Sequence, residues 1–358
     1  MNITFLIGNG FDLNLGLDTQ YANFLENYKN PDKEDGRGVR FLKELISDKE
    51  TESLWSNTEE SFGQLTAEFK KKGLNADDYC DSHDDFCEKL ANYLEKQQSR
   101  IDFEENRNQV IKGFVSVLKS YTNGFRDTEI DDINNIIKPL PGAMCFNFVN
   151  FNYTDTLDRC ISIAEKERTF LGSREYKSTV YGNYIEKSIH VHGTTKKSMV
   201  FGVNDISQLS DCTLFDNYGD EYISSVIKKQ TNEINRENTD KKTFDIIKSS
   251  DLIYIYGMSI GSTDKLWWER ICQVMKDKKH LQLIIHDYDA PKSELTMRLA
   301  RTNEKKFRLK FLNYSDIEEH EKEEIASRIH IDSSNIFSGL KDMADKSEQL
   351  ISPEPALV

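Results

Sequence analysis

The chain has 358 residues, which is enough for about two domains with a large buried core and excludes a small scaffold held by disulfides. Its 47 Lys and Arg residues and 61 Asp and Glu residues give a formal net charge of −14. This balance argues against a protein whose main task is to coat nucleic acid, and we expect no nucleic-acid partner.

We expect a globular cytoplasmic protein that does not enter membranes. No apolar run approaches the roughly 20 residues of a bilayer span, and the start lacks the cationic and apolar stretches of a secretion signal. The six cysteines are scattered, and no two form a Cys-x-x-Cys pair. We therefore expect reduced thiols.

The first predicted element is a buried strand over residues 3–7, which runs into the glycine turn 8–10. A helix is expected next, with Asp18 or Thr19 as its cap and the apolar positions of 21–28 on one face. A strand followed by a glycine turn and a helix is typical of the first unit of an α/β protein.

The pattern changes to helical periodicity from residue 36 to residue 138, most clearly in 86–94 and 110–121. Strand patterns return after this segment. The sequence therefore predicts a discontinuous Rossmann-like core (1–35 and 139–345), a helical insertion (36–138) and a C-terminal tail (346–358).

Further buried strands are predicted along the second half of the chain. They lie at residues 144–151, 188–191, 199–203, 251–256, 281–286 and 307–312. With the first strand they predict an α/β fold, a Rossmann-like and mostly parallel sheet with a large all-helical insertion. Ligands of such sheets bind outside the carboxyl ends of the strands, so the loops there are the candidate site.

The turn Gly8-Asn9-Gly10 connects a buried strand to a helix, and its backbone N–H groups could receive a phosphate. The third glycine is Gly16, which departs from the G-x-G-x-x-G fingerprint of dinucleotide-binding proteins. Glycines after a strand also serve tight turns, so both interpretations stay open.

Asn152 and Asp155 follow the strand predicted at 144–151. An amide and a carboxylate on such a loop can hold ribose hydroxyls. The alternative is that Thr154 or Asp155 caps the next helix.

His190 and His192 would face the same side of a strand, as zinc ligands do, but no third ligand is evident and we expect no metal. His192 stands beside Gly193, which would let a ligand approach closely, and imidazole titrates near neutral pH. His192 is therefore a candidate general base, although a histidine in such a position is more often structural.

The loop 257–264 is rich in glycine and hydroxyl side chains and follows another strand. Gly257 and other small residues could admit a nucleotide, and Ser259 could bond a phosphate or a ribose. For Asp264 we expect a helix cap, followed by tryptophans 267–268 in the core or in contact with a partner.

Four stretches taken in order, 5–12, 150–154, 190–193 and 256–259, resemble the AbiH family of bacterial abortive-infection proteins against phage. They resemble the sirtuin-like NAD-binding fold more distantly. The likeness runs from the first residues to beyond the tryptophan pair and covers the helical insertion only loosely.

In sirtuin-like proteins the first glycine turn cradles the phosphates of NAD, an Asn after the next core strand contacts the nicotinamide ribose, and a His before a Gly is the catalytic base. The resemblance therefore implies catalytic roles for Asn152 and His192. The cofactor-binding residues that we expect are Gly8, Asn9, Gly10, Asp12, Asp155, Gly193, Gly257 and Ser259. Thr154 stands where many of these motifs carry an acid, and the four-cysteine zinc module of the deacylases is missing.

These roles imply an anti-phage effector that hydrolyses NAD, its substrate, to ADP-ribose and nicotinamide without a metal. The partners expected are a phage-derived trigger or a partner defence protein, and further copies of the chain in a homo-oligomer. One alternative is a module that senses NAD or ADP-ribose without turnover. Another is a nuclease-like effector, against which the net charge of −14 and the missing metal-binding cluster count.

Overall fold

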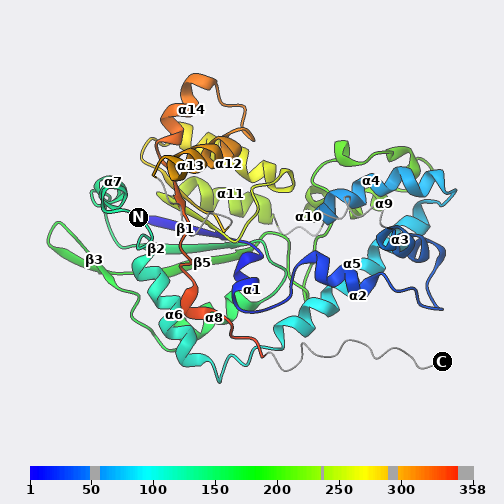
Figure 1. The fold of residues 1–358 in the computed structure, drawn as a ribbon, viewed down its shortest axis with the longest axis horizontal. Coiled ribbons are helices and arrows are strands. Elements are labelled where there is room, and N and C mark those ends of the chain that lie inside the picture. Colours follow the sequence, from blue (N-terminus) through cyan, green and yellow to red (C-terminus); the bar gives the residue numbers. More distant parts are fainter. Residues whose placement is uncertain (49–56, 235–237, 289–296, 346–358) are drawn as a thin grey trace.

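The centre of the computed structural model, which describes residues 1–48, 57–234, 238–288 and 297–345, is a six-stranded sheet (Figure 1). Its strands in spatial order are β5 (Tyr184–His190), β2 (Cys145–Asn150), β1 (Asn2–Ile7), β6 (Leu252–Tyr256), β7 (Gln282–His286) and β8 (Ile329–Asp332). Every neighbouring pair is parallel. The chain moves outward from β1 on one side, then returns to β6 and moves outward on the other, which confirms the predicted Rossmann-like α/β fold.

The central strands are buried on both faces. In β1, Phe5 belongs to one apolar core, where its ring stacks on Phe148 at 5.4 Å and on Tyr254 at 5.6 Å. Leu6 belongs to the core on the opposite face. Because successive side chains of a strand point to opposite faces, a sheet covered on both sides requires apolar residues at nearly every position.

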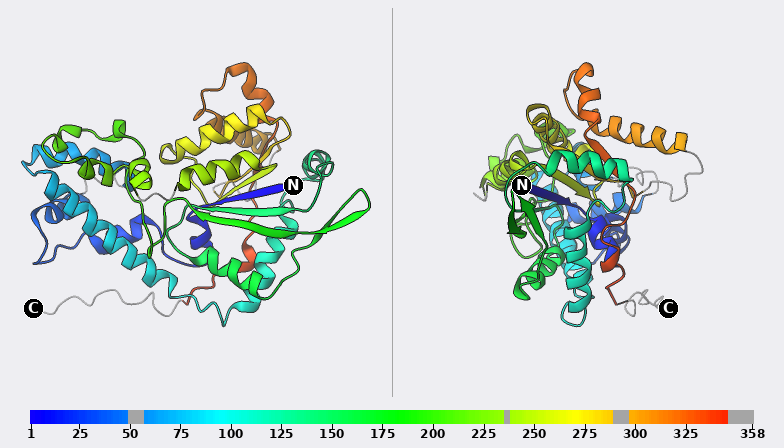
Figure 2. Two further views of the ribbon diagram at one scale, coloured as in Figure 1. Left: turned by 180° about the vertical axis from the view of Figure 1, so that it is seen from behind. Right: turned by 90° about the vertical axis from the view of Figure 1, so that its left-hand side faces the viewer.

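Helices cover both faces of the sheet, as Figures 1 and 2 show. The first core contains side chains of α1 (Gly10–Asn14), α6 (Arg107–Ser120), α7 (Asp127–Ile137) and α8 (Thr156–Lys166). The second contains side chains of α11 (Thr239–Ser249), α12 (Lys265–Asp277), α13 (Met297–Leu312) and α14 (Glu319–Ala326). None of the helices within the described ranges combines the length and the apolarity needed to cross a membrane.

A third apolar core lies beside the sheet and is built from helices (Figure 1). Its elements are α2 (Tyr21–Tyr28), α3 (Arg37–Ser47), α4 (Thr58–Lys71) and α5 (Ala76–Gln98), with side chains of α9 (Asp220–Ser225) against them; α10 (Lys228–Ile234) lies next to α9. Phe62 is at its centre, with its ring 4.7 Å from that of Phe86 and 5.2 Å from that of Phe201. We call this unit the helical core.

The segment 36–138 contains helices and no strand in its described part, but it does not form one unit. Its helices α3 to α5 belong to the helical core, whereas α6 and α7 pack on the sheet. Residues 201–227, expected in the Rossmann-like part, contribute to the helical core. The predicted tail 346–358 lies outside the described residues.

Two predicted strands are wrong. Residues 199–203 form a loop that places Phe201 in the helical core, and residues 307–312 are the last turns of α13. A short apolar run fits a strand or a buried helix equally well, and at 307–312 the buried side of a helix produced it. The prediction also missed β8 and a separate hairpin of β3 (Ser173–Tyr176) and β4 (Thr179–Gly182).

The predicted start of the first helix also needs correction. The short helix α1 follows the glycine turn directly, before α2. The residue at the cap of α2 is Gln20, and neither Asp18 nor Thr19 occupies that position. Thr19 instead donates its hydroxyl hydrogen bond to the Asn9 side chain, at 2.6 Å.

Candidate functional site

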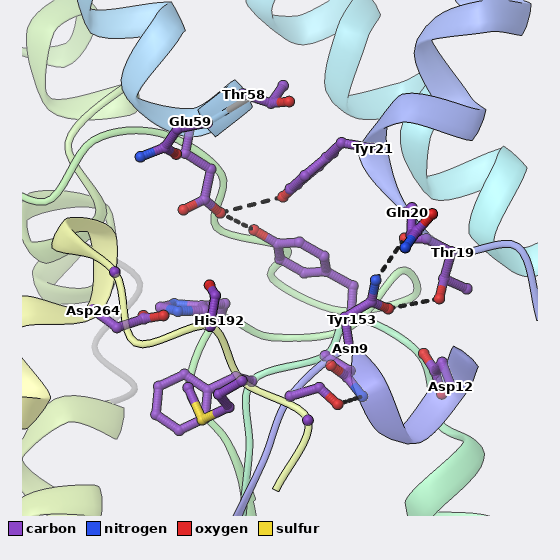
Figure 3. Close-up of a pocket in the computed structure, with 18 of the residues that line it drawn as sticks. Asn9, Asp12, Thr19, Gln20, Tyr21, Thr58, Glu59, Tyr153, His192 and Asp264 are labelled. Carbon is purple, nitrogen blue, oxygen red and sulfur yellow. Dashed lines mark hydrogen bonds between the residues drawn. The ribbon is translucent and has the colours of Figure 1, made fainter. Parts of the chain in front are cut away.

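A cavity of about 890 Å³ opens at the carboxyl ends of the central strands, between the sheet and the helical core (Figure 3). It lies at β1, where the chain order of the sheet reverses between β2 and β6. Ligands of open α/β sheets bind at this switch point. Seven of the residues predicted from the sequence line the cavity: Gly8, Asn9, Asp12, Asn152, His192, Gly257 and Ser259.

The two glycine turns at the floor of the cavity pack backbone to backbone. The amide of Gly8 donates to the carbonyl of Tyr256 at 2.9 Å, and the amide of Gly10 donates to the carbonyl of Gly257 at 2.8 Å. A Cβ atom at Gly10 would lie 2.4 Å from the Cα of Gly257. The glycines are thus required by this close contact, and these two N–H groups are engaged within the protein.

Asn152 lies just beyond the end of β2 and is held against the first glycine turn. Its Nδ2 donates to the carbonyl of Gly8 at 3.1 Å, and its backbone N–H donates to the side chain of Asn150 at 3.0 Å. The residue is buried and lines the cavity. These bonds fix the amide at the edge of the sheet where β1 and β2 end.

The two histidines near the end of β5 have different surroundings. His190 is the last residue of the strand, with Nε2 2.6 Å from the carboxylate of Asp158 and Nδ1 3.0 Å from the carbonyl of Asn152. Both of its ring nitrogens are therefore engaged, and it has a structural role. It does not line the cavity.

His192 lies two residues beyond the strand and lines the cavity. Neither ring nitrogen has a hydrogen-bond partner among the described residues, and Nδ1 is enclosed. Burial, with the charges of Lys228 and His190, holds the pKa of His192 well below its ordinary value. The imidazole is therefore neutral at pH 7 and can accept a proton.

Asp12 is almost fully buried behind the glycine turn. Its two carboxylate oxygens accept hydrogen bonds from the hydroxyls of Thr154 at 2.7 Å and Thr156 at 2.6 Å. Burial raises the pKa of Asp12 to about 6, although both hydroxyl bonds oppose the shift. The carboxylate thereby connects α1 to the loop that carries Asn152.

We expect Asp12→Ala to lower the free energy of unfolding by about 2 kcal/mol, because two buried hydroxyls lose their acceptor.

Asp12→Asn should keep one hydrogen-bond acceptor and instead change how the free energy of unfolding depends on pH. The folded-state pKa of about 6 exceeds the ordinary 3.8, so the folded state binds the extra proton between these values. Lowering the pH from 7 to 5 should then stabilise the original protein by about 1 kcal/mol relative to Asp12→Asn. Denaturant unfolding at both pH values measures this difference, and parallel pH responses would contradict the role given to Asp12.

A partly buried polar cluster on the far wall of the cavity was not predicted from the sequence. Glu59, in the first turn of α4, pairs with Lys228 at 2.6 Å and accepts hydrogen bonds from the hydroxyls of Tyr21 and Tyr153, each at 3.3 Å. Burial raises the pKa of both tyrosines well above its ordinary value, so they remain donors. The cluster brings charged groups of the helical core to the edge of the sheet (Figure 3).

Three predicted residues do not line the cavity: Gly10, Asp155 and Gly193. Asp155 is at the N-terminal cap of α8 but its side chain makes no capping bond, and it pairs with Arg159 at 2.7 Å. Gly193 has φ +69°, and a Cβ there would lie 1.9 Å from the carbonyl oxygen of Ser198. Gly193 therefore serves a tight turn.

Asp264 occupies the expected cap position of α12, but its side chain makes no capping hydrogen bond. It lines the cavity, as Ser259 does. Both tryptophans that follow are buried in the second core of the sheet, which agrees with one of the two alternatives for them.

Parallel strands in this order, with helices on both faces and a cavity at the switch point, define a Rossmann-like α/β protein. The family model described as "Bacteriophage abortive infection AbiH" matches residues 4–286, more than half of the chain. The chain therefore belongs to the AbiH family, and its function is phage abortive infection. No curated protein and no solved structure matches it significantly.

Proposed function

We propose that the protein carries out abortive infection by hydrolysing NAD to ADP-ribose and nicotinamide in this cavity. The observation that carries the proposal is His192, a neutral imidazole that has no hydrogen-bond partner in the described part of the chain and lines the same cavity as Asn152. A cavity of about 890 Å³ at the switch point of the sheet is also of the size of pockets that take nucleotide ligands.

The reaction transfers one proton, which comes from the attacking water. The bond between C1′ of the ribose and the pyridinium nitrogen breaks, and its electron pair neutralises the departing nicotinamide. The oxygen of a water molecule forms the new bond to C1′ and loses one proton. His192 accepts that proton through Nε2, the ring nitrogen that is not enclosed, and returns it to solvent.

Asn152 positions the reactants in this proposal. Its Nδ2 is held by Gly8, and its Oδ1 accepts no hydrogen bond from the described residues. The free oxygen would accept a hydrogen bond from a ribose hydroxyl or from the attacking water.

In an infected cell, the outcome would be loss of NAD, which stops growth before phage can multiply. Such an activity must be restrained in the resting cell. We propose that a phage-derived trigger or a partner defence protein releases it, in a homo-oligomer of the chain.

Release of nicotinamide from NAD by the purified protein, with and without infected-cell extract, tests the proposal. Asn152→Ala should lower the rate by about 10²-fold, because the substrate loses its orientation. If calorimetry shows stoichiometric binding and NAD is recovered unchanged under every condition, the protein is a sensor of NAD and not an enzyme that hydrolyses it. Metal-dependent degradation of a plasmid without NAD loss would favour a nuclease.

A further inference from the structure

The charged side chains that line the cavity are those of Asp12, Glu59, Lys228, Asp264 and Lys310, and some of them are engaged with other residues. Asp12 accepts bonds from two threonine hydroxyls, and Glu59 is paired with Lys228. Asp264 is different, because no hydrogen bond or ion pair to its carboxylate exists among the described residues. Its charge remains available to a ligand.

The position of Asp264 explains why its carboxylate stays free. As the cap residue of α12 it could accept the first N–H groups of the helix, which is the usual role of an aspartate there. Its side chain is directed into the cavity instead, on the side of His192 (Figure 3). Because Asp264 makes no capping hydrogen bond and lines the cavity, its carboxylate faces the space where a ligand would bind.

The surroundings of Asp264 disfavour the ionised form of its carboxyl group. Burial raises the pKa of Asp264 to about 6, and Glu59 adds to the shift while Lys228 opposes it. The group is still mainly ionised at pH 7. A cation that entered the cavity would therefore be attracted to this carboxylate.

We propose that Asp264 recognises the positive charge of the nicotinamide ring and makes the site selective for oxidised over reduced dinucleotide. This inference rests on the proposed function, because it assumes that NAD is the ligand of the cavity. The oxidised and reduced rings have nearly the same size and carry the same carboxamide. They differ in charge, which is positive on the pyridinium and absent on the dihydropyridine. A carboxylate attracts the first ring more strongly than the second.

The same carboxylate would favour bond cleavage. As nicotinamide leaves, the positive charge moves from the ring to C1′ and O4′ of the ribose, and a fixed anion nearby stabilises that charge. Glu59 is less suited to this task, since its charge is balanced by Lys228 and its oxygens accept two tyrosine hydroxyls.

Calorimetric titration with NAD and with NADH tests the selectivity. The protein carries His192→Ala throughout, so that NAD remains intact during the titration. This protein should bind NAD at least about tenfold more tightly than NADH. Adding Asp264→Asn should bring the two affinities to within about twofold of each other by weakening NAD alone, and Asp264→Glu should restore part of the preference. Asp277→Asn, the same change at the other end of α12, is the matched control and should keep the full preference.

Equal affinities before substitution, or an unchanged preference in Asp264→Asn, would overturn the role of Asp264. If the Asn variant fails to fold, Asp264→Ser provides the same comparison. Failure to bind either dinucleotide would overturn both proposals for the cavity. A preference for NAD that depends on Asp264, in a protein that with His192 intact never releases nicotinamide, would leave this inference standing and remove the proposed hydrolysis.

Discussion

Replacing His192 by alanine is expected to lower kcat for NAD cleavage by about 10²- to 10⁴-fold, the usual contribution of a general base. The substitution removes the imidazole that faces the cavity with no hydrogen-bond partner in the described structure. The substitution removes no hydrogen bond that the described residues make, so the fold should persist. Nicotinamide release in single turnover, with circular dichroism as a check of folding, measures the effect.

His320→Ala is the matched control, because His320 is an exposed histidine on α14, away from the cavity lining. It should cleave NAD at the original rate. The pH dependence of the rate of NAD cleavage provides a second test. Because burial holds the pKa of His192 well below its ordinary value, the imidazole stays unprotonated as the pH falls from 8 to 7, and protonation of the base should not lower the rate in this range. A His192→Ala protein with undiminished turnover would remove this residue from the mechanism.

Replacing Gly10 by alanine is expected to lower the free energy of unfolding by about 3 kcal/mol, at the upper end of the cost of inserting a methyl group into a packed interior. The new Cβ would lie 2.4 Å from the Cα of Gly257, and relief of this contact would pull on the hydrogen bond between the two residues. Backbone atoms, unlike the end of a flexible side chain, cannot move aside locally. Equilibrium unfolding in urea measures the loss.

Gly182→Ala tests whether any glycine substitution has this effect. Gly182 is an exposed residue of β4, and a Cβ there would meet nothing within 4 Å. Its stability should change by less than about 0.5 kcal/mol. Equal losses in the two variants would show that the packing of the glycine turns is not the reason for Gly10.

The central strands could be predicted because a sheet covered on both faces imposes its own pattern. The strands β1, β2, β6 and β7 are buried, mainly apolar runs that match the predicted positions closely, although β2 also contains Asn147 and Asn150. The strand β8 has only four residues, among them His330 and Asp332, and such a short mixed segment resembles a loop. The run 307–312 was ambiguous since helix burial and strand burial both concentrate apolar residues.

The part of the candidate site that follows the strands could also be predicted, because parallel strands bring their carboxyl ends to one edge. Asn152 and His192 line one cavity for this reason. Glu59 and Lys228 could not be found in the same way. Each stands among other charged residues of a helix end, as solvated residues do, and only the tertiary contact between α10 and α4 brings them together.

The cavity is bounded by two bodies whose apolar interiors are distinct, the sheet with its covering helices and the helical core. Such bodies can melt separately when little holds them together. A molecule bound between them touches both, and its binding energy is lost as soon as either one opens. A ligand bound in the cavity would thus convert two melting steps into one cooperative transition. The resistance of the helical core to proteolysis would then report whether a ligand is bound at the edge of the sheet.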